Sequence, residues 1–264
     1  MSDCYQILKC LFKPFPLRNG NGTVENFLYR GFKDEYLYLC RYTREDNLSD
    51  LINGKWKVFQ RWIFSDKHER GEYPGTLNFY FDSASKDIDW KYTNREREIQ
   101  KTIKEHIKST SYIPAICLTK WRGYDDYFFW KSYTSDKNGI CIKFKLKDLI
   151  KSIRQYDIDF LMSKMEYKDT FDFKTIDDAL YAKVPSYRHE REYRIYLQNR
   201  DGSPIKCNEK GNTVINIDFE ILNPTIIISP FSDYTTRRAE LIEKYPQLEK
   251  RIIKSKIIEN VLLK

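Results

Sequence analysis

The apolar positions of the 264-residue chain change their spacing several times along the sequence. Alternating or short continuous apolar runs bounded by turn residues are typical of strands, because side chains alternate between the two faces of a strand. In GICIKF, for example, Ile140, Ile142 and Phe144 fall on one face. Such runs predict strands at residues 35–43, 55–64, 113–120, 139–144, 165–169, 192–198, 221–230 and 254–258.

Apolar residues at three- and four-residue steps predict helices between these strands. One such run begins after Thr43 or Asn47, either of which can cap it, and ends at Gly54. The run at residues 94–109 has an asparagine cap, early glutamates and isoleucines four residues apart. Further helices are predicted at residues 127–133, 147–156, 175–183 and 233–245.

Helices interspersed among short strands, without a regular strand–helix–strand period, favour an α+β fold. We expect a single domain over residues 36–264, with a mixed, mostly antiparallel sheet core and flanking helices. A turn-rich, charged stretch near residues 66–94 interrupts the pattern and is expected to be an insertion. Pro14 and Pro16 break the apolar run near the start, so we expect residues 1–35 to form an N-terminal accessory segment.

Charge and aromatic content narrow the range of partners. The formal net charge is +8, and 16% of residues are Phe, Trp or Tyr. A positive balance favours polyanionic partners such as nucleic acids and nucleotides, although lysine-rich solubility is the commoner explanation of a modest excess. Aromatic rings pack in cores and also stack on flat ligands.

Cysteine and histidine usage argues against a metal site and against a disulfide framework. The six cysteines have no C-x-x-C spacing, and the three histidines lie far apart. No secretory leader is recognisable, so we expect a reduced, cytoplasmic protein with buried thiols. Apolar runs are much shorter than the roughly 20 residues that cross a bilayer, and we expect no membrane association.

The segment HEREYR, residues 189–194, concentrates charge in an otherwise apolar region. If it is a strand, Glu190, Glu192 and Arg194 share one face, while His189 and Tyr193 point the other way. Two carboxylates on one face repel each other, which can raise the pKa of one and suit it to proton transfer. The commonest setting of such a face is an exposed ladder of ion pairs.

Several segments resemble, in order, a bacterial and phage-borne family catalogued as domain of unknown function 2971. The resemblance covers about residue 36 to the end of the chain. It rests on CLTKWRGYDDYFFWKSYTSDKNGICIKF and ALYAKVPSYRHEREYR, with IIISPFSD towards the end. The chain departs from the family pattern at Tyr187, where a tryptophan is frequent, and at Ser132, where a histidine is frequent. The positions that match the family pattern are Trp130, Tyr133, Gly139, Lys183, Glu190, Glu192 and Arg194.

More distantly, the same order of features resembles the ADP-ribosyltransferase superfamily, which implies that NAD is a substrate. The resemblance implies an early arginine, here Arg41 or Arg30, and a middle element at Ser132 or Tyr133. It also implies a late catalytic glutamate, Glu192, preceded by Glu190. An activity of this kind implies a transferase or glycohydrolase, a toxin or phage-defence effector, and a protein or nucleic-acid acceptor. An ADP-ribosyltransferase-like fold would follow.

The residues suit the chemistry that this resemblance implies. Breaking the nicotinamide–ribose bond creates an oxocarbenium-like centre, which the Glu192 carboxylate can stabilise. An early arginine can clamp the pyrophosphate through its fork of donors. Trp130 and Tyr133, three residues apart, would share a helical face and sandwich a ring, and Lys183 can contact phosphate.

Two functions of other classes remain open. A noncatalytic nucleic-acid or nucleotide-binding module would use the positive charge and the aromatic rings. A metal-dependent nuclease would use Glu190 and Glu192 with Asp125 or Asp126, although no metal-binding motif supports it.

Overall fold

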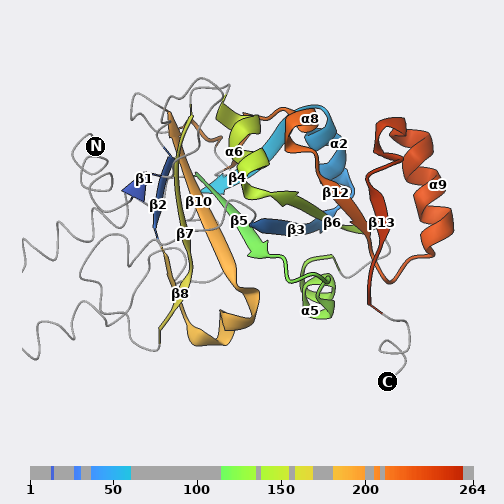
Figure 1. Cartoon of the computed structure of the whole chain (residues 1–264), viewed down its shortest axis with the longest axis horizontal. Coiled ribbons are helices and arrows are strands. Elements are labelled where there is room, and N and C mark those ends of the chain that lie inside the picture. Colours follow the sequence, from blue (N-terminus) through green and yellow to red (C-terminus); the bar gives the residue numbers. More distant parts are fainter. Residues whose placement is uncertain are drawn as a thin grey trace, which may run out of the picture. The chain divides into compact units, whose positions relative to one another are not determined.

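The computed structural model describes residues 13–14, 27–30, 37–60, 114–134, 138–154, 158–168, 181–199, 205–208 and 212–257. The chain divides into two compact units (Figure 1). Unit 1 contains Met1–Gly31, Val58–Ile116 and Asp159–Thr213, and unit 2 contains Phe32–Lys57, Cys117–Ile158 and Val214–Lys264.

Unit 2 is built on a mixed sheet. Its strand order is β5 (Pro114–Lys120), β3 (Tyr38–Arg44), β6 (Gly139–Lys145), β12 (Thr225–Ile228) and β13 (Ile252–Lys254). All neighbours pair antiparallel except β12 and β13, which are parallel. Helix α9 (Tyr234–Lys244) provides the crossover that a parallel pair needs, and the short helix η5 (Pro246–Leu248) follows it.

The two faces of β3 and β6 are covered by different elements. On one face, Tyr42 and Cys141 pack with Phe129 and Trp130, which belong to helix α5 (Tyr127–Phe129) and the π-helix η3 (Trp130–Thr134). The other side of the strands carries α2 (Asp46–Ile52), α6 (Leu146–Arg154) and α8 (Phe219–Leu222), as Figure 1 shows. With both faces covered, β6 is buried along most of its length.

Unit 1 contains strands in the order β1 (Lys13–Pro14), β2 (Phe27–Arg30), β7 (Ile158–Lys164), β10 (Glu192–Asn199) and the start of β5. β2 and β7 are parallel. Successive residues Tyr193, Arg194 and Ile195 are all buried, so both faces of β10 are covered at this point. Strand β4 (Lys55–Gln60) pairs with β5 and with β11 (Asn212–Asn216).

A small parallel pair, β8 (Glu166–Tyr167) and β9 (Ala182–Lys183), precedes β10 in unit 1. The 3-10 helix η4 (Pro185–Glu190) then leads into β10. Proline at the first turn of η4 suits a helix start, because its ring presets the backbone angle and the missing N–H would have no helical partner there.

The predicted fold class, an α+β fold with a mixed and mostly antiparallel sheet, is confirmed. Strands lie within the first six predicted strand segments, whereas the predicted strand at 221–230 begins in helix α8 and becomes a strand only at Thr225. Helices α2, α6 and α9 lie where the helical spacing placed them. Gly54 follows α2 with a φ of 73°, a conformation that glycine adopts without strain. The predicted helix at residues 94–109 lies outside the described residues.

Three local predictions were wrong. Neither Thr43 nor Asn47 caps α2: the N-cap residue is Glu45, and Asn47 lies inside the helix, where its amide donates to the Thr43 hydroxyl at 2.6 Å. The helix predicted at residues 175–183 does not extend to its predicted end, because residues 182–183 form strand β9, which pairs with β8. The last strand was predicted at residues 254–258, but β13 begins two residues earlier and ends at Lys254. Its residues Ile252 and Ile253 pair with β12.

The predicted boundaries at residues 1–35 and 36–264 stay predictions, as does the insertion at 66–94, which lies outside the described residues. Among the residues that the structure describes, no helix combines the length and the apolar character needed to cross a bilayer.

Candidate functional site

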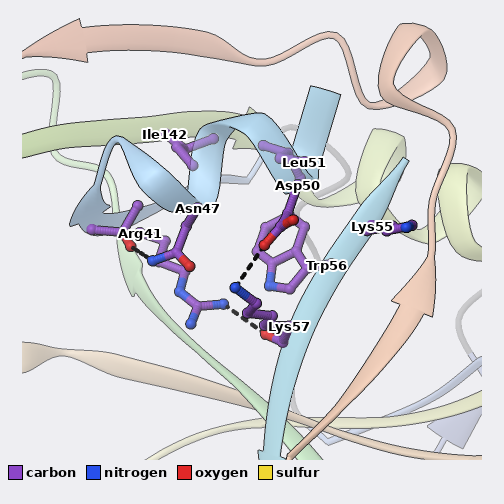
Figure 2. A pocket seen from close by; sticks show the side chains of 9 residues that line it. Arg41, Asn47, Asp50, Leu51, Lys55, Trp56, Lys57 and Ile142 are labelled. Atoms are coloured by element: carbon purple, nitrogen blue, oxygen red, sulfur yellow. Dashed lines mark hydrogen bonds and ion pairs between the residues drawn. The ribbon is translucent and has the colours of Figure 1, made fainter. Parts of the chain in front are cut away.

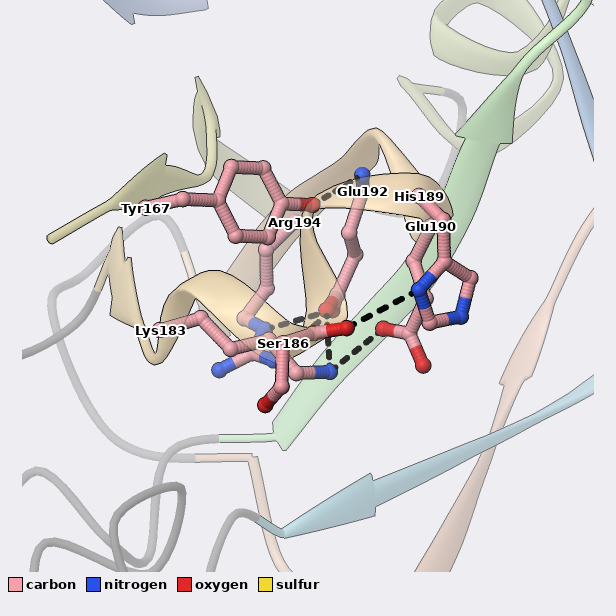
Figure 3. A network of polar contacts seen from close by, with 7 residues as sticks. All are labelled: Tyr167, Lys183, Ser186, His189, Glu190, Glu192 and Arg194. Carbon is pink, nitrogen blue, oxygen red and sulfur yellow. Dashed lines mark hydrogen bonds and ion pairs between the residues drawn. The ribbon is translucent and has the colours of Figure 1, made fainter. Parts of the chain in front are cut away.

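Two glutamates of unit 1 converge on one lysine (Figure 3). The ammonium nitrogen of Lys183 lies 2.5 Å from a carboxylate oxygen of Glu190 and 3.1 Å from one of Glu192. All three side chains are buried. Removing charges from water is costly unless they are paired, and here the pairing is direct. We call Lys183, Glu190, Glu192 and Arg194 the charged cluster.

The backbone reaches this arrangement by a different route from the one the sequence predicted. Glu190 ends the 3-10 helix η4, and only Glu192 lies in strand β10, so the two do not share a strand face. Arg191 between them has a φ of 45°, in the left-handed region. This turn directs both carboxylates to Lys183 although they sit on different elements. The two glutamates therefore lie close together, as predicted, but the prediction that they share a strand face was wrong.

Arg194 and Tyr167 fix the position of Glu192. The Arg194 Nε atom donates to a Glu192 carboxylate oxygen at 2.9 Å, and its Nη2 atom lies 2.7 Å from the same oxygen. Glu192 and Arg194 therefore lie on one face of β10, as the alternation predicted. The Glu192 backbone N–H donates to the Tyr167 hydroxyl at 2.9 Å. Burial raises the pKa of Tyr167 to about 12, so its phenol is neutral at physiological pH.

An aromatic ring lies beside the cluster. The Lys183 ammonium is 4.5 Å from the centre of the half-buried Tyr187 ring, within the range of a cation–π contact. His189 is exposed, and its Nδ1 atom lies 3.0 Å from the Ser186 carbonyl oxygen.

Arg41 lines a small pocket of unit 2 (Figure 2). The guanidinium donates to the Lys57 carbonyl oxygen at 3.2 Å and lies 5.7 Å from the centre of the Trp56 ring. The Lys57 ammonium pairs with Asp50 at 2.6 Å. The pocket lies between α2, β4 and the face of β3 and β6 that carries α2. Ile142 of β6 also lines it.

Trp130 and Tyr133 do not form the predicted sandwich. Trp130 is fully buried, and its indole N–H donates to the Asp125 carboxylate at 2.9 Å. Tyr133 is exposed and stacks on Phe129, with ring centres 5.7 Å apart. The π-helix puts one ring into the core and the other at the surface, which a regular helical spacing does not anticipate. The assignment of Trp130 as a cofactor-binding residue is therefore corrected to a core residue.

Arg41 and Tyr133 also lie on opposite sides of the unit 2 sheet. Tyr42 stacks on Phe129 at 5.1 Å and meets Trp130 edge-on at 5.0 Å, which places it on the Tyr133 side. Its neighbour Arg41 points to the other face, towards Trp56. These two predicted cofactor-binding residues therefore do not line one cleft.

The predicted site residues fall in both units. Glu190, Glu192, Lys183 and Arg194 meet in unit 1, whereas Arg41, Trp130, Ser132 and Tyr133 belong to unit 2. Ser132 is exposed, and the side chain of Arg30 lies outside what the structure describes. Sequence reasoning missed Tyr167, because its contact with Glu192 spans 25 residues and has no local signal. Within the described part of the chain, no group of three or more potential ligands could hold a metal.

Searches of curated proteins and of solved structures give no match for the chain. A family model matches residues 129–195, which run from Phe129 through the π-helix to the charged cluster. This match supports the family resemblance for that part of the chain, and it includes Glu190, Glu192 and Lys183. By this comparison, residues 129–195 are similar to the family described as Protein of unknown function (DUF2971).

Proposed function

We propose that the protein is an NAD-consuming enzyme of the ADP-ribosyltransferase type, which breaks the nicotinamide–ribose bond and transfers ADP-ribose to water or to an acceptor. One observation carries the proposal. Two carboxylates, Glu190 and Glu192, converge on one positive charge, the Lys183 ammonium, at 2.5 and 3.1 Å. A pair of carboxylates preorganised around a cation is suited to stabilise the positive charge that develops in glycosidic cleavage.

In this proposal the two glutamates have different roles. Glu192 is held from both sides, by Arg194 and by the backbone contact with Tyr167, so its carboxylate keeps a fixed position. It stabilises the oxocarbenium-like ribose as nicotinamide leaves. Glu190 ends η4, next to the left-handed Arg191. It accepts the proton from the attacking water or acceptor hydroxyl, as a general base does.

Lys183 acts as the cation that the substrate replaces. Without substrate, its ammonium pairs with both carboxylates, and Arg194 supplies the second positive charge. The positively charged nicotinamide ribose takes over that role when it binds, and the lysine side chain turns towards the phosphates. The Tyr187 ring, 4.5 Å from the ammonium, offers a flat face to the nicotinamide ring. The proposal uses residues of unit 1 alone, and the early arginine of the resemblance, Arg41 or Arg30, stays a prediction.

Such an activity suits a toxin or phage-defence effector, because NAD depletion or modification of a cellular protein or nucleic acid stops growth. The test is incubation of the purified protein with NAD and with labelled acceptor mixtures, followed by chromatographic measurement of released nicotinamide. The wild type should release nicotinamide. Glu192→Gln should reduce the rate by about 100-fold or more, because it removes the charge that stabilises the transition state.

Glu166→Gln is the matched control, since Glu166 lies in the same unit on β8 and pairs with Lys168 at the surface. This variant should keep the wild-type rate. Thermal unfolding of each variant shows whether a loss of rate is a loss of fold. The proposal is overturned if the wild type releases no nicotinamide under any of these conditions, or if folded Glu192→Gln releases it at the wild-type rate.

A further inference from the structure

Four aromatic side chains stand exposed within one short segment of unit 2. The segment follows β5 and contains α5 and η3. We call the four side chains the aromatic surface. Soluble proteins rarely leave such clusters of large apolar groups open to water unless the cluster binds something. Its members and their exposed fractions are Tyr124 at 52%, Tyr127 at 37%, Phe128 at 48% and Tyr133 at 49%.

The segment is anchored, so these rings are presented on a fixed base. Asp125 is buried and accepts hydrogen bonds from the Trp130 indole at 2.9 Å and the Lys256 backbone N–H at 2.8 Å, and from the Ser255 hydroxyl. Phe129 and Trp130 fill the core beneath. The exposed rings therefore lose little conformational freedom when they bind a flat partner.

Positive charge is interleaved with the rings. The Lys131 ammonium lies 5.9 Å from the centre of the Tyr127 ring and 5.0 Å from that of Phe231. Lys143 lies on the face of β6 that packs against Phe129 and Trp130. Its ammonium is 5.1 Å from the centre of the Trp121 ring and 5.4 Å from the centre of the Tyr38 ring. Lys131 and Lys143 each lie beside two aromatic rings on this side of unit 2.

Within Trp121–Tyr133 the charges of Asp125 and Asp126 balance those of Arg122 and Lys131, so the positive excess on this side of unit 2 comes from Lys143 and Lys145, which lie beside the Tyr38 ring. Asp125 is buried beneath the segment, and Asp126 caps α5 by accepting from the Phe128 N–H at 2.9 Å. A partner with many negative charges and flat rings complements such a surface better than an acidic peptide does, because a peptide offers few rings to stack.

We infer that the aromatic surface, with Lys131 and Lys143, binds single-stranded nucleic acid by stacking bases on exposed rings while the lysines contact phosphates. Stacking on several rings needs unpaired bases, so a duplex should bind more weakly. The inference concerns unit 2 and is independent of the NAD chemistry proposed for unit 1.

The test is fluorescence anisotropy with labelled oligo-dT and oligo-U of about 20 nucleotides, long enough to cover a typical site. Binding should be tighter for single strands than for a duplex of the same length and should weaken as salt rises. Tyr124→Ser and Phe128→Ser should each weaken Kd about tenfold, because base stacking on one ring contributes that much. Lys131→Ser should reduce the slope of log K against log salt by about 0.7.

Val214→Ser and Ile221→Ser are matched controls, since these side chains are exposed apolar groups on β11 and α8, at 46% and 41%. They should leave Kd unchanged. The inference is overturned if single strands do not bind at low salt. It is also overturned if a duplex binds as tightly, or if folded Tyr124→Ser and Phe128→Ser bind like the wild type.

Discussion

The Lys183 ammonium lies 2.5 Å from a Glu190 carboxylate oxygen, and both side chains are almost completely shielded from water. A buried ion pair gains little net stability over apolar residues, because removing both charges from water is costly. Here Glu192 and Arg194 extend the pair to two positive and two negative groups. Formal charges balance within the cluster, and removal of any one member leaves a net charge in the interior.

Lys183→Met should lower the free energy of unfolding by about 3–5 kcal/mol, the usual cost of leaving a buried charge without its partner. Urea unfolding followed by circular dichroism measures the change. The control is Lys164→Met, at an exposed lysine of β7, which should change stability by less than about 0.5 kcal/mol. The double variant Lys183→Met/Glu190→Leu should recover part of the loss. A loss below about 1 kcal/mol for Lys183→Met would contradict this account.

Tyr167 should make stability depend on pH in the alkaline range. Its pKa is about 12 in the folded protein against 10.0 in the unfolded chain, because burial disfavours the phenolate. The unfolded state therefore releases the proton first as pH rises. The stabilisation is complete below about pH 10 and is lost between about pH 10 and 12.

Tyr167→Phe should flatten the fall of the unfolding free energy across that range, as measured by urea unfolding at several pH values. Tyr124→Phe, at an exposed ring, is the matched control and should follow the wild-type curve. Equal slopes for Tyr167→Phe and the wild type would show that another group controls the alkaline transition.

Asp125→Ala should destabilise unit 2 by about 3 kcal/mol, because it removes the acceptor of the Trp130 indole, the Ser255 hydroxyl and the Lys256 N–H. Tryptophan fluorescence during urea unfolding reports the change. Asp46→Ala, at an exposed acid of α2, is the control and should cost less than about 1 kcal/mol. If both variants lose the same stability, Asp125 does not anchor the segment.

Substitutions at two glycines distinguish the cost of backbone strain from the cost of a steric clash. Gly54 and Gly123 both have positive φ, of 73° and 95°. A Cβ on Gly54 would lie 2.9 Å from the Ile217 carbonyl oxygen, whereas one on Gly123 would meet nothing within 4 Å. Gly123→Ala should cost about 1–2 kcal/mol of strain, and Gly54→Ala should cost more. Thermal unfolding measures both, and the reverse order would refute the role of the close contact.

Local sequence signals identified most elements of the fold. Apolar alternation located β3 and β6, and helical spacing located α6 and α9, because these patterns match faces that the fold buries. The cap of α2 was missed, since the Asn47 side chain bonds to Thr43 rather than to the helix N-terminus. Strand β9 was missed because its pairing with β8 is a tertiary contact with no local trace.

The sequence identified the residues of the charged cluster but not how they are arranged. Glu190, Glu192 and Arg194 stood out by their charge and order, and the structure brings them together with Lys183. The left-handed Arg191 could not be foreseen, because arginine has no preference for that conformation. The separation of Trp130 from Tyr133 depends on a π-helix, whose irregular turn is decided by packing rather than by residue spacing.

The charged cluster and the Asp125 anchor also differ in how far apart along the chain their members lie. Lys183 and Glu190 are separated by 7 residues, whereas Asp125 and Ser255 are separated by 130. Closing the longer loop costs about 2.5 kcal/mol more in chain entropy by the logarithmic scaling with loop length. We therefore expect the cluster to assemble early in folding and the segment after β13, which carries Ser255, to dock last. In pulse-labelling hydrogen exchange, the amides around Glu192 should then gain protection before the amide of Lys256.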